Sequence, residues 1–185
     1  NLAWLLTTIP LFTACSPAPE TNSALPPAEA TAAENSGIKA GVDYHSFSNP
    51  GEVTVTHLDL ELTADFAASV LSGSATLTYE KQTAQADTLV VDTRDLTIQS
   101  VTVNGETLDY QLQPADPELG AALEIDLPEQ GNKVTIEYAT SPQASGVQWL
   151  TPSQTAGKQH PFLFTQAQAV HARSFIPLQD SPQVR

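Results

Sequence analysis

The side chains that could carry out chemistry in this sequence are few and widely separated. Histidine occurs four times, as His45, His57, His160 and His171. None of them forms a two-histidine pair on a helix. None stands with a cysteine or a carboxylate at the spacing of metal ligands either. We therefore expect a structural role for all four histidines and no metal site in this chain.

Catalytic nucleophiles and acid–base pairs are missing as well. The sequence has no Gly-x-Ser-x-Gly motif and no glycine-rich phosphate loop. Two carboxylate pairs, Asp59/Glu61 and Glu124/Asp126, alternate with apolar residues. This pattern places them on the solvated face of a strand, where carboxylates are rarely catalytic. The residues alone predict no catalytic group in this chain.

The single cysteine, Cys15, has a distinctive setting. Residues 2–14 form a short apolar run that ends in Thr13-Ala14, directly before Cys15. The run is too short to span a bilayer and has the form of a signal peptide with small residues at its cleavage site. It resembles a bacterial lipobox, which predicts a lipoprotein-type signal segment over residues 1–15 and lipidation at Cys15. A plain secretory signal, or a buried apolar end with an incidental cysteine, is the alternative.

Residues 16–42 consist mainly of Pro, Ala, Ser, Thr, Glu and Asn, with almost no large apolar side chain. Such a segment buries too little apolar surface to offset the entropy of ordering, so we predict a disordered linker. A linker between a lipidated cysteine and a domain predicts an exported lipoprotein that is anchored to the membrane, either in the periplasm or at the cell surface.

The charge of the chain is divided unevenly. The net charge is −14, and residues 43–138 contain 17 acidic and 3 basic residues. Residues 139–185 contain one acid, Asp180, and three bases. The overall charge argues against binding to nucleic acid, whose partners are usually basic. The neutral later segment, rich in amides and aromatic residues, suits a surface that another domain covers or that faces a ligand.

From about Val53 onward the sequence predicts one strand after another. Apolar residues alternate with polar ones in runs about ten residues apart: Leu58/Leu60/Leu62, Ala75/Leu77/Tyr79, Leu108/Tyr110/Leu112, Leu123/Ile125/Leu127 and Val134/Ile136/Tyr138. Val53 and Val55 lie on the opposite phase, which predicts a bulge near His57. Ser72-Gly73-Ser74 predicts a bend before the second run, and Asn104-Gly105 predicts a hairpin turn. The pattern indicates an all-β domain, a β-sandwich over residues 43–185.

The last part of the chain resembles a known family. The resemblance rests on Gln148–Pro152, Gly157-Lys158, His160–Ala169 and Pro177–Pro182, together with Asp92–Ile98 and Asn104-Gly105. This run is similar to the amino-terminal domain of the leukotriene A4 hydrolase and aminopeptidase N family, the M1 zinc metallopeptidases. The resemblance covers residues 43–185 and implies a saddle-like β-sandwich, followed in the family by a catalytic domain.

The resemblance also implies where function lies. The family binds zinc through a His-Glu-x-x-His motif in the catalytic domain, and that motif is absent here. No residue of this chain is therefore expected to be catalytic or to bind metal, and zinc is expected in the parent enzyme only. The family's Gln-x-Gln segment, which lines the substrate channel, falls on Gln166, Ala167 and Gln168. Alternatively, the two glutamines satisfy a buried strand edge against the next domain.

The predicted function is therefore that of the amino-terminal β domain of a bacterial zinc aminopeptidase, inactive by itself. Its partners would be the peptide substrate, its own downstream catalytic domain and the membrane, through the lipid anchor. The lack of methionine and the polar last residues lead us to expect a fragment of a longer protein. The rival hypothesis is a surface-anchored β-sandwich that serves adhesion or binding without enzymatic activity.

Overall fold

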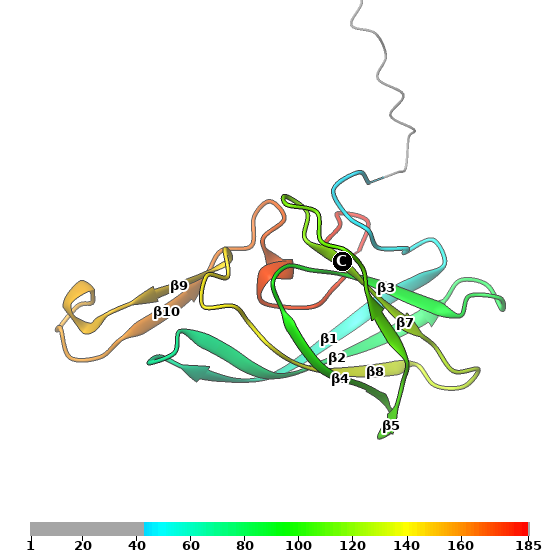
Figure 1. The fold of residues 1–185 in the computed structure, drawn as a ribbon, viewed down its shortest axis with the longest axis horizontal. Coiled ribbons are helices and arrows are strands. Elements are labelled where there is room, and N and C mark those ends of the chain that lie inside the picture. Colours follow the sequence, from blue (N-terminus) through cyan, green and yellow to red (C-terminus); the bar gives the residue numbers. More distant parts are fainter. Residues whose placement is uncertain (1–42, 185) are drawn as a thin grey trace, which may run out of the picture. The chain divides into compact units, whose positions relative to one another are not determined.

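The strands form three antiparallel sheets in the computed structural model, which describes residues 43–184 (Figure 1). Sheet order is β1-β2-β8-β4-β5 in the largest sheet, β3-β7-β6 in the second and β10-β9 in the third. The strands are β1 (Val53–Asp65), β2 (Val70–Lys81), β3 (Thr88–Thr93), β4 (Thr97–Val103), β5 (Glu106–Thr107), β6 (Tyr110–Leu112), β7 (Ala121–Asp126), β8 (Lys133–Ala139), β9 (Val147–Leu150) and β10 (Phe162–Thr165).

The main core lies between the five-stranded and the three-stranded sheet. Alternate residues of each strand point inward, as the pleat of a strand requires. The fully buried members include Ala75, Leu77, Leu89, Val91, Val101, Leu123, Ile125, Val134 and Ile136. Full burial of one such side chain contributes about 1.5–3 kcal/mol. The predicted all-β sandwich is confirmed, and the buried alternations of β2, β7 and β8 are those seen in the sequence.

The predicted bulge in β1 is present. The register between β1 and β2 shifts between Val55 and His57, which leaves Thr56 as the extra residue. The shift brings Leu58 and Leu62 onto the core side, where both pack against buried residues. Leu60, between them, remains 43% exposed. Among residues 43–184, therefore, no element fully covers the middle of this apolar row.

The Asn104-Gly105 turn also forms as predicted, but the strand after it is shorter than expected. Both turn residues have positive φ, 51° and 83°, and join β4 to β5. However, β5 has only two residues, and the chain then crosses to the other sheet as β6. Tyr110 and Leu112 are 38% and 46% exposed, so the expected apolar face of this segment is wrong. β6 pairs with β7 at the edge of the smaller sheet, where all of its residues are exposed.

The final segment adds a hairpin and a second, smaller core. β9 and β10 pair only with each other, and their connection includes the 3-10 turn η1 (Pro152–Gln154). A second 3-10 turn, η2 (Ala172–Ser174), comes after β10 in the chain. Leu71, Ala144, Val147, Ala172 and Phe175 form the buried cluster here. In residues 43–184 we find no helix with the length and apolarity that crossing a membrane requires.

Candidate functional site

The segment Gln166–Gln168 leaves the end of β10 and is exposed on the domain surface. Both glutamines are exposed, whereas Ala167 is half-buried and packs against the second core. The Gln166 backbone N–H donates to the Gly146 carbonyl at 2.9 Å. The Gln168 N–H donates to the Gln166 side-chain oxygen at 3.2 Å. The His171 N–H donates to the Ala167 carbonyl at 2.8 Å. The backbone of this segment is thus held by local bonds.

The two glutamines differ in what their side chains do. Gln166 uses its amide oxygen to accept the bond from Gln168, so it shapes the turn. The side-chain amide of Gln168 makes no hydrogen bond to any residue from 43 to 184. An exposed amide can donate and accept at once, which suits contact with a peptide backbone. Within the described domain, Gln168 is the better candidate for binding an outside group.

A cavity of about 580 Å³ opens directly after this segment. Ala169 and Val170 line it, together with Leu178, Asp180 and His45. Its walls combine apolar side chains with two carboxylates, those of Asp43 and Asp180, and one imidazole. The cavity thus begins at Ala169, the residue after Gln168.

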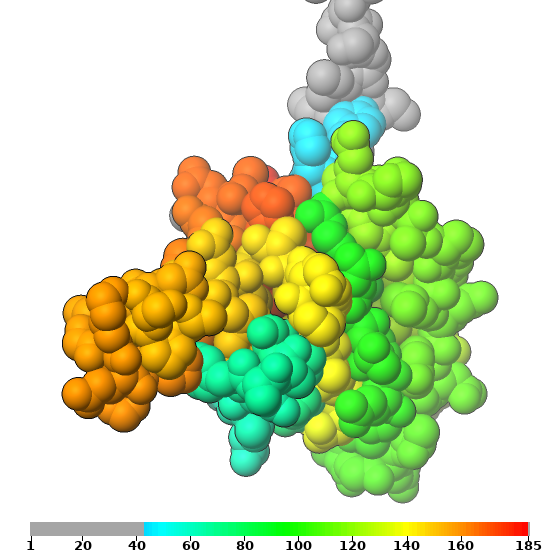
Figure 2. Space-filling model, turned by 60° about the vertical axis from the view of Figure 1, so that its left-hand side comes forward, coloured from blue at the N-terminus to red at the C-terminus, as the bar shows by residue number. Residues whose placement is uncertain are grey.

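The hairpin of β9 and β10 has one face toward the domain and one face away from it. Trp149 and Leu163 pack against the second core, and the Trp149 ring meets Phe66 edge-on with centroids 5.3 Å apart. Figure 2 shows this hairpin, in orange, beside the turn that joins β1 and β2. Phe162 and Phe164 are on the opposite face and are 54% and 38% exposed. An exposed aromatic face thus leads along β10 into the glutamine segment.

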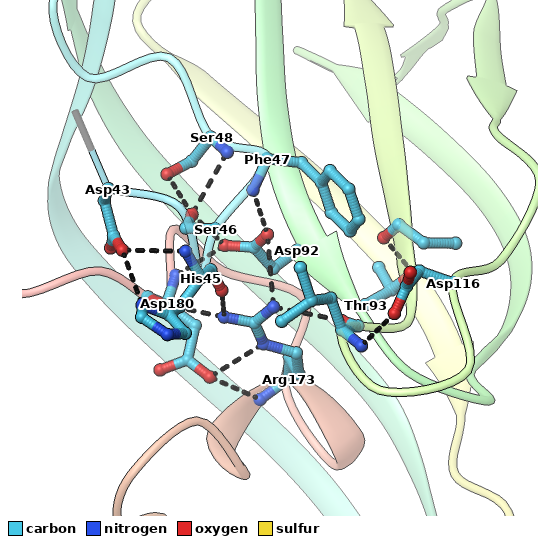
Figure 3. A network of polar contacts seen from close by, with 12 residues as sticks. Asp43, His45, Ser46, Phe47, Ser48, Asp92, Thr93, Asp116, Arg173 and Asp180 are labelled. Carbon is cyan, nitrogen blue, oxygen red and sulfur yellow. Dashed lines mark hydrogen bonds and ion pairs between the residues drawn. The ribbon is translucent and has the colours of Figure 1, made fainter. Parts of the chain in front are cut away.

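Arg173 in η2 is the centre of a buried polar network (Figure 3). Its side chain is 0% exposed. Nε donates to the Asp180 carboxylate at 3.1 Å, and Nη1 donates to the Leu119 carbonyl at 3.0 Å. Nη2 donates to the carbonyls of His45 and Asp180 at 2.7 and 3.1 Å. The Asp92 carboxylate lies 3.6 Å from Nη1. One guanidinium therefore ties four distant parts of the chain together.

Asp92, at the end of β3, is the second buried charge of this network. Its carboxylate accepts hydrogen bonds from the Ser46 hydroxyl and from the backbone N–H groups of Phe47 and Asp180. Burial raises the pKa of the Asp92 carboxyl, while these bonds and the Arg173 charge act in the opposite direction. The carboxylate orders both the start of the domain and the segment after η2.

Gln179 attaches the last part of the chain to the edge of β1. It is 3% exposed. Its amide nitrogen donates to the Val53 carbonyl at 2.8 Å, and its amide oxygen accepts from the Val55 N–H at 2.9 Å. These bonds replace the partners that an edge strand lacks. Part of the neutral segment that we expected to meet a ligand or another domain is thus buried within its own domain.

The network around Arg173 was not predicted from the sequence, although the sequence contains two signals of it. Asp180 is the single acid of residues 139–185, and Arg173 lies seven residues before it. Asp92 ends the apolar run Leu89-Val90-Val91, where a charge is unusual. Their closeness to His45 and Leu119 depends on the tertiary fold, and spacing in the sequence does not show it.

The other residues singled out from the sequence do not gather at a site. His45 and His57 are 76% and 65% exposed and pair with nearby aspartates, and His160 is also exposed. His171 is half-buried and lies 2.8 Å from the Ser145 hydroxyl. Residues 43–184 contain no group of three or more His, Cys, Asp or Glu side chains that could hold a metal ion. Cys15 and the linker 16–42 lie outside the described residues.

Known proteins are similar in sequence to most of this chain. Residues 54–185 match the model of the peptidase M1 N-terminal domain. Leukotriene A-4 hydrolase of Xenopus laevis is 41% identical over 148 residues, which cover 77% of this chain and 24% of that protein. Leucine aminopeptidase 2 of Pyricularia oryzae is 36% identical over 152 residues, 79% of this chain and 25% of that protein. The chain spans about a quarter of these relatives.

Solved structures of similar proteins have the same fold. Native leukotriene A4 hydrolase from Saccharomyces cerevisiae superposes with a TM-score of 0.73 at 32% identity, covering 80% of this chain and 24% of that one. An M1 zinc metallopeptidase from Deinococcus radiodurans gives a TM-score of 0.54 at 19% identity, covering 76% and 32%. The second likeness is one of fold alone.

Proposed function

This chain belongs to the family of peptidase M1 N-terminal domains, and from that membership we propose that it is the amino-terminal β domain of a bacterial zinc aminopeptidase. The parent enzyme removes amino-terminal residues from peptides. The relative named leucine aminopeptidase 2 and the match to a peptidase M1 domain support this activity. The chain spans about a quarter of the length of its relatives, which supports a longer parent protein. In this proposal the catalytic domain comes after this one.

Within that enzyme, we propose that Gln166–Gln168 forms part of the wall of the substrate cleft. The observation that carries this is the exposed Gln168 amide, which has no hydrogen-bonding partner within residues 43–184 although its own backbone is held in place. A neutral amide on a fixed backbone can bind the amino end of a peptide without imposing a charge. The alternative is that both glutamines, which are exposed in this domain, satisfy a strand edge that the next domain buries.

Zinc is proposed for the parent enzyme, but the residues described here do not fit a zinc site. They provide no cluster of three ligand side chains, and the chain lacks His-Glu-x-x-His. We therefore assign no metal ligand and no catalytic step to this domain. Its contribution to the reaction is to bind and orient the peptide.

We also propose that the protein is exported and that a lipid on Cys15 anchors it to a membrane. The support is the apolar run ending in Thr13-Ala14 before Cys15 and the linker composition of residues 16–42. An anchor on a linker would hold the enzyme near the membrane while leaving the domain free to meet peptides.

The proposed function is tested with the purified full-length protein. Short peptides with a free amino terminus should be shortened from that end, and peptides with an acetylated amino terminus should remain intact. Dialysis against a chelator should abolish the activity, and added zinc should restore it. Failure to cleave any of a panel of free-amino peptides, with zinc present and the protein folded, would contradict the proposal and favour the adhesion module.

A further inference from the structure

The turn at Ser145-Gly146 contacts the candidate segment on both sides. The Gly146 carbonyl accepts the N–H of Gln166 at 2.9 Å, just before Gln168. The Gly146 N–H donates to the hydroxyl of Ser174, which comes after Gln168 in the chain, at 2.8 Å. The Ser145 hydroxyl lies 2.8 Å from Nδ1 of His171. One short turn thus holds both the entry and the exit of the loop that carries Gln168.

Ser174 completes this arrangement with a single hydroxyl. It is 1% exposed and therefore has no access to water that could replace a lost partner. Its oxygen accepts from the Gly146 N–H, and its proton goes to the His171 carbonyl at 2.7 Å. Removal of the hydroxyl would leave the buried Gly146 N–H without a partner. The His171 carbonyl would keep only the Ser174 backbone N–H, at 3.1 Å. The loop would then lose its link to the turn at the residue after Arg173.

Gly146 allows the close approach on which these bonds depend. A Cβ atom at this position would lie 2.6 Å from the His171 carbonyl oxygen and 2.7 Å from the Phe175 ring. Real Cβ contacts are not this short, so the two backbones can meet here only through glycine. We call Ser145, Gly146, His171 and Ser174 the Gly146 seat.

We infer that the Gly146 seat positions Gln168 for peptide binding and that Ser174 is its main positioning residue. This inference rests on the proposed function. A hydrogen bond from Gln168 to a peptide needs a donor–acceptor distance of about 2.9 Å and a narrow range of angles. A loop released from the seat would hold Gln168 in that geometry for less of the time. Ser174 acts on the substrate through Gln168 and does not touch it.

The experiment measures kcat/KM for a short peptide in the full-length enzyme carrying Ser174→Ala. We expect kcat/KM to fall about two- to fivefold, because a misplaced Gln168 loses part of the free energy of its neutral hydrogen bond to the peptide. Ser145→Ala, at an exposed position, should give a smaller fall in the same direction. Thr93→Val is the matched control, because it also deletes a buried hydroxyl that bonds a backbone carbonyl, 2.9 Å away at Ala121. This control should leave kcat/KM unchanged.

A double variant separates a positioning role of Ser174 from a general loss of stability. The double variant Ser174→Ala/Gln168→Ala should be no slower than Gln168→Ala alone, because both changes remove the same contact. Hydrogen exchange gives a readout that does not depend on activity. Ser174→Ala should speed amide exchange in residues 165–171 and leave β3 unchanged.

The outcomes are distinct. Unchanged exchange in residues 165–171, or effects of Ser174→Ala and Gln168→Ala that simply multiply, would overturn the inference. Faster exchange with normal kcat/KM in both single variants would instead show that the seat holds the loop but that Gln168 binds no peptide. That second result contradicts the proposed role of Gln168 and, with it, the inferred positioning for peptide binding.

Discussion

Arg173 shows how a single buried charge can organise a domain made of strands. Moving a guanidinium out of water costs several kcal/mol, and this cost is offset only when its donors are paired. Here the carboxylate of Asp180 and the carbonyls of His45, Leu119 and Asp180 accept its hydrogen bonds. The arginine therefore contributes mainly by fixing which segments meet. The attraction between its charge and the carboxylates contributes less.

The corresponding prediction is that Arg173→Met destabilises the domain strongly. Two carboxylates, on Asp92 and Asp180, would lose their buried countercharge, at a cost of about 3–5 kcal/mol. Urea denaturation of residues 43–185 measures this as a shift in the free energy of unfolding. Lys158→Met, which removes an exposed cation, should change stability by less than about 0.5 kcal/mol. Equal unfolding midpoints for the two variants would refute the organising role of Arg173.

At the scale of single residues, the sequence pointed to Gln168 as a candidate site residue but did not predict the contacts of Arg173. Gln166–Gln168 could be singled out because a contiguous motif resembles a family segment. The network of Arg173 joins residues 45, 92, 119 and 180, which come together only after the sheets have packed. No local pattern encodes such a meeting, and a single sequence cannot reveal it.

At the scale of the elements, strand pairing depends on places where two backbones approach closely. Gly73 lies inside β2 with φ +144°, and a Cβ there would lie 2.1 Å from the Glu61 carbonyl oxygen of β1. The bend that we predicted at Ser72-Gly73-Ser74, ahead of the next strand, is wrong. β2 begins at Val70 and runs through these residues. The glycine lets the two strands stay paired at this point.

We predict that Gly73→Ala destabilises the domain by about 1–3 kcal/mol, since alanine is strained at this φ and meets the neighbouring strand. Gly51→Ala is the control, because no atom lies within 4 Å of its added Cβ. Thermal unfolding of the two variants, monitored by circular dichroism, makes the comparison. A Gly73→Ala domain as stable as wild type would mean that β1 and β2 can separate here without cost.

The elements themselves could largely be predicted, while their partners could not. The bulge near His57 and the Asn104-Gly105 turn result from local phase and turn chemistry, and both are present. The short β5 and the crossing to β6 depend on competition between two sheets for the same segment. That competition is settled by packing, and so Tyr110 and Leu112 were misplaced.

For the whole molecule, we predict that residues 43–185 alone are inactive. The described part of the chain offers no metal-binding cluster, so the segment should bind no stoichiometric zinc and cleave no peptide. Metal analysis after dialysis, together with a peptide cleavage assay, tests both expectations. One zinc ion per chain that survives dialysis would show that this domain has a metal site of its own.

The anchor is a second property of the whole molecule. Cys15→Ala should release the full-length protein from membranes or mislocalise it, because the lipid would have no attachment point. Fractionation of cells into membrane and soluble parts, with wild type as the reference, measures the change. Unaltered membrane association of the Cys15→Ala protein through this segment would contradict a lipid anchor on Cys15.

The claim that this β domain lines the peptide site is tested most directly by Gln168→Ala in the full-length enzyme. We expect kcat/KM for short peptides to fall about three- to tenfold, the effect of losing one neutral hydrogen bond, with an unchanged melting temperature. Gln130→Ala, an exposed amide in the turn before β8, should alter neither quantity. A lower melting temperature with normal kcat/KM would contradict the claim and make Gln168 a structural residue.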